Sequence, residues 1–261
     1  MGIRGPVYFR HVDFASERYV ASIAKAMVVV LNPQLVGVYL HGSAVLGGFD
    51  ARRSDVDIVF VSNGSMSRQQ QTAVAHSLSE EALHCPARGL ELSVVTHEVA
   101  LHPSTRPPFE LHITTAPDDS KVVDGHGRAG DSDLVLHFAV CRTAGQLIGS
   151  GLPRQEAFGP VPQALVLDQL VRELEWGAEH VPNEYAVLNA CRAWRYATDG
   201  TLVSKVEGGE WALNHVRERA HMDLVKTGLS HQRSSASPAL DPSAVQRFVK
   251  EIQSKVRPAR L

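Results

Sequence analysis

The sequence predicts an α+β protein in which an α/β region is followed by an all-helical region. Two observations support this prediction. Short runs of β-branched residues alternate with amphipathic stretches in the first part of the chain, whereas later apolar residues recur only at three- and four-residue steps. The length of 261 residues suits one large or two modest domains. We expect a first domain over residues 1–157 and a second over residues 158–261.

The α/β region begins with a predicted helix from Phe14 to Leu31, whose apolar residues share one face and which Asn32-Pro33 ends. Three later runs rich in β-branched residues predict strands, an intervening stretch predicts a helix, and a loop-rich segment holds one further strand. The ranges are Leu35–Leu40, Val56–Ser62 and Leu90–Thr96 for the strands, Ser67–Leu83 for the helix, and Phe109–Thr114 for the last strand.

The rest of the chain predicts helices only. Gly149 and Asp199-Gly200 are stop signals, and Ser204 with Glu207 fits a capping box that opens a helix. The predicted helices are Leu134–Ile148, Gln163–Trp176, Glu184–Thr198, one after Ser204 that runs through Trp211 and Val216, and Asp241–Val256, with a loop over 234–242.

The composition excludes several classes of protein. A net charge of −2 without runs of one sign argues against a nucleic-acid binder. No apolar stretch is long enough to span a membrane, and the start of the chain lacks the apolar core of a signal peptide. The three cysteines have no metal-binding spacing, which favours reduced thiols. We expect a cytoplasmic monomer that binds neither nucleic acid nor membrane.

Two aspartates stand at the start of one predicted strand. Because residues i and i+2 of a strand point to the same side, Asp55 and Asp57 project together and repel each other. A hard divalent cation such as Mg²⁺ relieves that repulsion and leaves coordination sites for phosphates. Glu91 stands in the next predicted strand and would join them, either as a third ligand in a two-metal site or as a base beside one metal. A pair of acids at a strand start is alternatively solvated surface chemistry, but the third acid favours a site.

The turn before these aspartates adds a second feature. Gly42 and Ser43 offer backbone N–H groups and a hydroxyl to a phosphate. Of the 13 histidines, only His41 is predicted to lie near this chemistry.

The segment GSAVLGGFDARRSDVDIVF (42–60) resembles the signature of the DNA polymerase β-type nucleotidyltransferase superfamily. More narrowly, this segment with DSDLVLHFAVCRTAGQLIG (131–149) and YAVLNACRAWRYATDGTLVSKVEGGEWA (185–212) resembles the aminoglycoside nucleotidyltransferases that adenylylate streptomycin and spectinomycin. The resemblance implies a nucleotidyltransferase domain with a mixed sheet and flanking helices, then a helical-bundle domain. It also implies ATP and Mg²⁺ as cofactors, AMP transfer to an antibiotic hydroxyl, and release of pyrophosphate.

The resemblance also assigns roles to single residues of the first domain. Asp55 and Asp57 match the metal ligands, and Glu91 matches the acid that takes the proton from the attacking hydroxyl. Ser43 and Ser54 match hydroxyls on the phosphate side.

Three further residues match the nucleotide side of the family's site. Asp133 matches an acid that contacts the nucleotide, whereas the alternative is a helix-start acid favoured by the helix dipole. Arg192 and Lys205 match positively charged residues that reach the triphosphate. Their alternatives are a surface arginine and a first-turn lysine behind the Ser204 cap.

The antibiotic is expected in a cleft between the domains. Trp176 offers a flat face for a sugar ring, and Glu184 or Asn183 offers polar contacts, although each is alternatively a solvated helix residue. Family members that accept streptomycin carry a tryptophan where this sequence has Ala116 or a near neighbour. Spectinomycin is therefore favoured over streptomycin.

Two other functions stay open. The same fold could transfer AMP to another small molecule or to a protein, or the chain could bind nucleotides without catalysis. Intact Asp55, Asp57 and Glu91 argue against the second alternative, because a dead site has no reason to keep three acids that repel one another.

Overall fold

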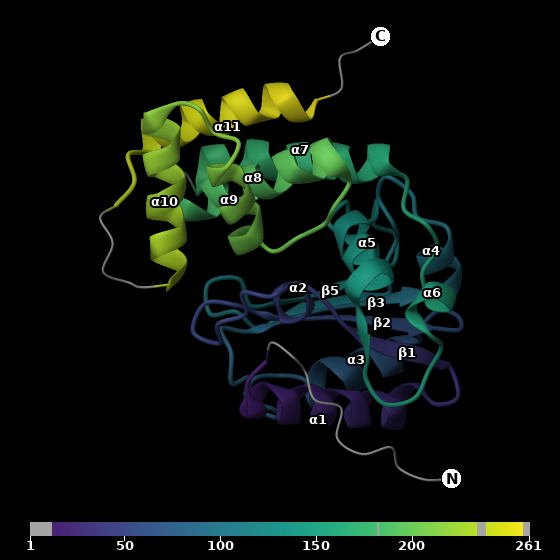
Figure 1. Ribbon diagram of the computed structural model, residues 1–261. Helices are drawn as coiled ribbons and strands as arrows, with labels where there is room; N and C mark the ends of the chain where they lie inside the picture. Colours follow the sequence, from purple (N-terminus) through teal and green to yellow (C-terminus); the bar gives the residue numbers. More distant parts are fainter. Residues whose placement is uncertain (1–11, 182, 234–238, 258–261) are drawn as a thin grey trace. The chain divides into compact units, whose positions relative to one another are not determined.

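The computed structural model describes residues 12–181, 183–233 and 239–257 (Figure 1). The chain forms two compact units, Met1–Val161 and Pro162–Leu261. The first contains a mixed sheet with flanking helices and the second contains helices, so the predicted α+β class is confirmed. The division falls a few residues after the expected boundary at 157, because Phe158 is buried in the core of the first unit.

The first unit is built on a six-stranded sheet with the order β5-β4-β3-β2-β1-β6. Strands β2 and β3 are parallel, and every other neighbouring pair is antiparallel. The strands are β1 (Leu35–Leu40), β2 (Val56–Ser62), β3 (Leu90–Thr96), β4 (Leu111–Thr114), β5 (Lys121–Asp124) and β6 (Gln146–Leu147). The helices of this unit are α1 (Phe14–Leu31), α2 (Ser43–Leu46), α3 (Arg68–Ser77), α4 (His97–Leu101), α5 (Leu134–Ala144) and α6 (Arg154–Ala157).

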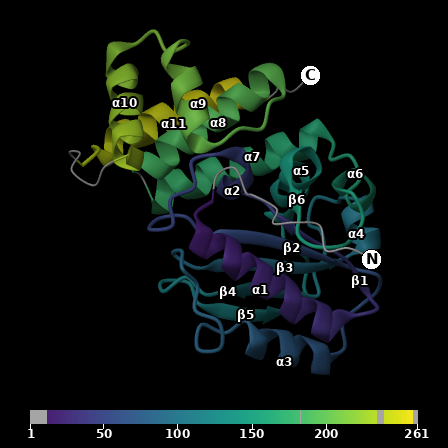
Figure 2. The same ribbon diagram turned by 60° about the horizontal axis from the view of Figure 1, so that its bottom comes forward.

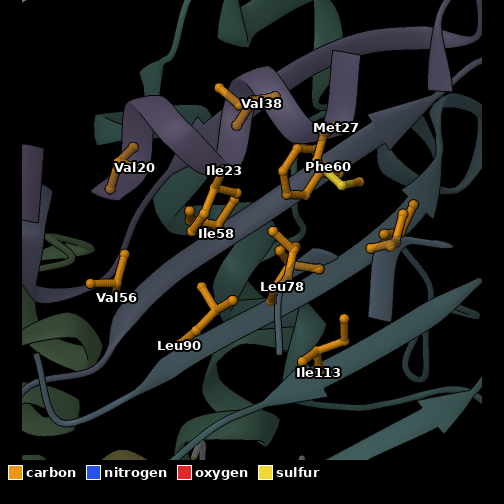
Figure 3. Packing of buried hydrophobic residues seen from close by; sticks show 14 of the residues in the cluster. Val20, Ile23, Met27, Val38, Val56, Ile58, Phe60, Leu78, Leu90 and Ile113 are labelled. Atoms are coloured by element: carbon orange, nitrogen blue, oxygen red, sulfur yellow. The ribbon is translucent and has the colours of Figure 1, made fainter. Parts of the chain in front are cut away.

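Helices α1 and α3 cover one face of the sheet (Figure 2). Helix α1 begins at Asp13, whose side chain accepts a hydrogen bond from the backbone N–H of Ser16. Its apolar residues recur at the spacing of one helix face and meet alternate residues of the strands. Figure 3 shows this packing, in which Ile23 and Met27 lie against side chains such as Ile58 and Phe60.

The opposite face of the sheet is apolar at one end and polar at the other. Val59, Val61 and Val95 pack against Phe138 of α5 and against Phe158. Because side chains alternate between the faces of a strand, Asp57 and Glu91 lie on this same face, nearer the start of their strands. The polar end of this face is the candidate site.

The second unit has five described helices, of which α8 contacts each of the others. They are α7 (Gln163–His180), α8 (Glu184–Asp199), α9 (Lys205–Leu213), α10 (Arg219–Arg233) and α11 (Pro242–Val256). Gly200 ends α8 in the left-handed conformation at φ 72°, and the predicted capping box between Ser204 and Glu207 opens α9. None of the described helices combines the length and the apolar character that a membrane crossing requires.

The structure corrects the predicted elements in several places. Helix α3 ends at Ser77 instead of Leu83, α7 continues to His180, and α9 ends at Leu213 before Val216. Helix α5 ends at Ala144 instead of Ile148, because the following residues pair with the edge of β1. Strand β5 and helix α10 were not predicted. The expected loop over 234–242 falls largely outside the described residues.

A pair of helical glycines tests the packing of the second unit. A Cβ at Gly208 of α9 would lie 2.8 Å from backbone atoms of Arg192, whereas at Gly177 of α7 the nearest atom would be 3.6 Å away. We expect Gly208→Ala to lower the free energy of unfolding by about 1–3 kcal/mol, because α9 must move away from α8. Gly177→Ala should leave it unchanged or raise it by up to about 1 kcal/mol through helix propensity. Urea denaturation of both variants checks this, and equal effects would contradict the close approach.

Candidate active site

The central feature of the site is the register between β2 and β3. Asp57 and Glu91 are partners in this parallel pair, so their side chains point to the same face from adjacent strands. Asp55 comes directly before β2 and, by alternation, projects to the same side as Asp57. The structure therefore brings the three acids identified in the sequence to one end of one sheet face.

Asp55 is held by an arginine that the sequence analysis missed. Nη1 of Arg88 lies 2.7 Å from Oδ2 of Asp55, and Nη2 of the same guanidinium donates to both carboxylate oxygens of Asp118 at 2.6 and 2.8 Å. The other oxygen of Asp55, Oδ1, is buried and accepts no hydrogen bond from any described residue. Burial raises the pKa of Asp55, Arg88 opposes that rise, and Glu91 adds to it.

Asp57 packs against the glycine of the preceding turn. Gly42 has φ 62° and ψ −145°, and a Cβ there would lie 1.7 Å from Oδ2 of Asp57. Only a glycine at position 42 leaves room for the Asp57 carboxylate so close to the backbone of the turn. The backbone N–H of His41 also donates to the backbone oxygen of Asp57 at 2.9 Å, which fixes the turn to β2.

A histidine on α5 contacts Glu91. Nε2 of His137, on α5, lies 3.7 Å from Oε1 of Glu91, and the ring of His137 packs against that of His41 with 4.6 Å between centroids. Burial lowers the pKa of His41 well below 6.5, and the neighbouring His137 adds to this, so His41 stays neutral. Nδ1 of His112, on β4, lies 3.0 Å from Oγ of Ser93, two residues after Glu91.

The prediction that His41 alone lies near the acids was therefore wrong. His137 had a signal in the sequence, because it stands one helical turn after Asp133 near the start of the predicted helix. The pairing of β4 with β3, which brings His112 to the same face, had no such signal.

The residues fit a hard divalent cation. The negatively charged groups at this end are the carboxylates of Asp55, Asp57 and Glu91, and Oδ1 of Asp55 is buried and accepts no hydrogen bond from a described residue. The three acids do not form a closed cage. Among the described residues, the one set of three whose ligand atoms lie within 4.8 Å of one another is Glu218, His221 and Glu251 in the second unit. An open carboxylate set suits a cation that takes its remaining ligands from water and substrate phosphates.

The other predicted residues of the first unit lie close to these acids in the chain. Ser43 begins α2 and is half-buried. The hydroxyl of Ser54 already accepts a hydrogen bond from the backbone N–H of Asp50 at 3.1 Å, so it fixes the connector. Asp133 is exposed at the start of α5, where its backbone oxygen accepts a hydrogen bond from the N–H of His137 at 3.2 Å.

The two positively charged residues predicted to contact the triphosphate, Arg192 and Lys205, lie where α9 crosses α8. Nη2 of Arg192 lies 2.8 Å from Oε2 of Glu173, so Arg192 is held within its own unit. Nζ of Lys205 lies 4.5 Å from the centroid of the Tyr185 ring. The close approach at Gly208 brings the first turns of α9 against the backbone of Arg192.

The three predicted acceptor residues lie at the adjoining ends of α7 and α8. Trp176 is 51% exposed, and its ring stacks on that of His180 with 5.3 Å between centroids. Asn183 caps α8 by accepting a hydrogen bond from the N–H of Tyr185, which gives its side chain a structural role. Oε2 of Glu184 lies 3.4 Å from Nδ1 of His231.

Comparisons with known proteins agree with this architecture. Residues 156–255 match the family model described as the C-terminal domain of aminoglycoside adenylyltransferase. The chain is 21% identical to an aminoglycoside (3'') (9) adenylyltransferase of Klebsiella pneumoniae, over 87% of this chain and 89% of that protein. It is 24% identical to an Escherichia coli protein of the same name, over 71% and 73%. The fold is similar to the crystal structure of the spectinomycin adenyltransferase AAD(9) from Enterococcus faecialis with ATP and spectinomycin, with a TM-score of 0.71 and 14% identity over 92% and 99% of the two chains.

Gly42 allows a direct test of the acid site. Gly42→Ala would force the carboxylate of Asp57 away, and we expect it to weaken binding of Mn²⁺, a probe for hard divalent cations, by about tenfold or more. The matched control is Gly47→Ala, because Gly47 also has a positive φ, of 91°, but a Cβ there would meet nothing within 4 Å. Electron paramagnetic resonance titration of Mn²⁺ in the presence of ATP measures the effect, with circular dichroism to verify folding. Equal losses in the two variants would contradict a specific contact at Asp57.

Proposed function

Since the comparisons confirm the resemblance to the aminoglycoside adenylyltransferases, we propose that this chain is a nucleotidyltransferase that moves AMP from ATP to a hydroxyl of an aminoglycoside or aminocyclitol antibiotic. Pyrophosphate is the second product. The observation that carries the proposal is the register of Asp57 with Glu91 beside Asp55, because a phosphoryl-type transfer needs metal ligands and a base at one place. The fit of these acids to a hard cation supports Mg²⁺ as the metal.

The first unit supplies the reacting groups. Asp55 and Asp57 would hold Mg²⁺, which when bound would neutralise charge on the phosphate oxygens. Glu91 accepts the proton of the acceptor hydroxyl as its oxygen forms a bond to the α-phosphorus of ATP. The bond from that phosphorus to the oxygen bridging the α- and β-phosphates breaks, and the electron pair leaves with pyrophosphate. His137 lies against Glu91 and limits the orientations of its carboxylate.

Each unit, taken by itself, contains residues that we propose as contacts of the nucleotide. Gly42 and the hydroxyl of Ser43 contact phosphate oxygens, while Ser54 keeps the connector in shape. Asp133 contacts the nucleotide from the exposed start of α5. For the second unit, we propose Arg192 and Lys205 as the triphosphate contacts, because the packing of α9 on α8 and the Glu173 carboxylate restrict where their charges can lie.

For the acceptor we propose spectinomycin in preference to streptomycin. Trp176 exposes an aromatic face to a ring, and Glu184 offers a carboxylate to an amine, with Asn183 fixing the helix start between them. Ala116 is 3% exposed and packs against Gly89, so this side chain offers no aromatic face to an antibiotic. We further propose that the protein acts as a monomer in the cytoplasm, where its three free cysteines stay reduced.

The base assignment has a matched control on the same strand–helix segment. Glu91→Gln keeps the shape of the side chain but cannot take the proton, so we expect AMP transfer to fall by about 10²- to 10⁴-fold. Glu98→Gln should have no effect, because the side chain of Glu98 is 82% exposed and pairs only with His102 among the described residues. Pyrophosphate release under saturating Mg²⁺ and ATP measures both. Retained activity in Glu91→Gln would exclude Glu91 as the base.

The acceptor preference is tested by pyrophosphate release with spectinomycin, streptomycin and several unrelated aminoglycosides. We expect turnover with spectinomycin and none or little with streptomycin. Trp176→Ala should raise KM for the antibiotic about 2- to 13-fold, as loss of an aromatic contact of roughly 0.5–1.5 kcal/mol would do, with KM for ATP unchanged. Turnover with no antibiotic, while ATP still binds, would exclude drug modification and favour another small-molecule or protein acceptor of AMP.

A further inference from the structure

Arg88 stands in the loop directly before β3 and has no role in the site proposed above. Its guanidinium forms a fork, with Nη1 on Oδ2 of Asp55 at 2.7 Å and Nη2 on both oxygens of Asp118. The side chain of Arg88 is 35% exposed, whereas that of Asp55 is 22% exposed and that of Asp118 is 72% exposed. Arg88 therefore links a partly buried acid of the site to a surface acid.

The backbone around Arg88 is tied to the same connector that carries Asp55. The backbone N–H of Arg88 donates to the backbone oxygen of Ser54 at 3.2 Å. The backbone N–H of Val56 donates to the backbone oxygen of Gly89 at 2.8 Å. These two bonds flank Asp55 on both sides. Arg88 and Asp55 are consequently fixed relative to each other through the main chain as well as through the ion pair.

The contact determines which oxygen of Asp55 is available. The guanidinium takes Oδ2, and Oδ1 is left buried without a donor among the described residues. A carboxylate with one oxygen fixed and the other unpaired is already in the orientation of a monodentate metal ligand. Because Asp118 offsets the charge of Arg88, the pair contributes orientation more than net positive charge.

We propose that Arg88 is a positioning residue of the metal site, which holds Asp55 so that Oδ1 faces the cation, and that Asp118 anchors Arg88 in this role. The inference rests on the proposed function, because Asp55 is a ligand only if a cation binds there. It adds two residues that act through a ligand instead of touching the metal. Loss of Arg88 should therefore weaken binding of the cation without changing how the antibiotic is bound.

The test is the binding of Mn²⁺, measured by electron paramagnetic resonance with the non-hydrolysable analogue α,β-methylene-ATP. We expect Arg88→Gln to raise the dissociation constant of Mn²⁺ by about tenfold or more, and Asp118→Asn by a smaller factor. Arg88→Lys should recover part of the loss, because an ammonium can reach one acid but cannot fork between two. The matched control is Arg52→Gln, because Arg52 pairs with Asp50 at 2.8 Å but is 80% exposed and touches no ligand.

Steady-state kinetics give a second readout. Arg88→Gln should raise the Mg²⁺ concentration needed for half-maximal AMP transfer and leave KM for the antibiotic unchanged. Mn²⁺ binding in folded Arg88→Gln that equals or exceeds that of the parent chain would overturn the inference, since Arg88 would then be structural or would compete with the cation. If Arg88→Gln does not fold, Asp118→Asn decides in the same way.

The outcomes separate this inference from the function on which it rests. A parent chain that binds no Mn²⁺ with the nucleotide analogue would overturn the metal site and the role of Arg88 together. Weakened Mn²⁺ binding in Arg88→Gln, with no antibiotic adenylylated by the parent chain, would support the role of Arg88 and exclude only the proposed acceptor.

Discussion

The site depends on one constraint, the parallel register that places Asp57 opposite Glu91. That register is fixed by the other face of the same strands, where Val56, Ile58 and Leu90 are fully buried in the core that α1 and α3 cover. A slip of one residue would turn these apolar side chains toward the site and the acids into the core. The hydrophobic core therefore holds the three carboxylates close together, because the free energy gained by folding the sheet offsets their mutual repulsion.

The acids are compensated by neighbours that come from different parts of the chain. Arg88 donates a hydrogen bond to Asp55 from the loop before β3, and His137 approaches Glu91 from α5. The neutral His41 supports the ring of His137 without adding charge. Since only one of these neighbours carries a permanent positive charge, the end of the sheet keeps an excess of negative charge for a cation. These neighbours offset enough of the negative charge for the chain to fold, and the negative charge that remains attracts a metal cation.

Strands β1, β2 and β3 could be predicted with their observed bounds, because each is a short run rich in β-branched and other apolar residues between turn signals. Helix α10 was missed although its buried residues Val225 and Leu229 are four positions apart, because Gly228 and many polar residues make its sequence a weak helix signal. Leu224, Val225 and Leu229 are nonetheless buried, so tertiary packing favours the helix despite the low propensity of glycine. Helix α5 ends before Gly145, whereas the prediction placed its end at Gly149, because the residues between these glycines pair with β1.

The candidate site shows the same difference between local and long-range information. Asp55, Asp57 and Glu91 could be found because strand periodicity alone determines the side to which each points. Arg88 could not, because its role comes from a loop whose backbone is tied to residues more than thirty positions earlier, at Ser54 and Asp55. Groups that react are therefore encoded in regular strands, whereas groups that orient them come from loops and from neighbouring elements. Substitutions in such loops should change metal affinity while the reacting acids stay intact, which gives this fold a way to adjust its chemistry without altering its sheet.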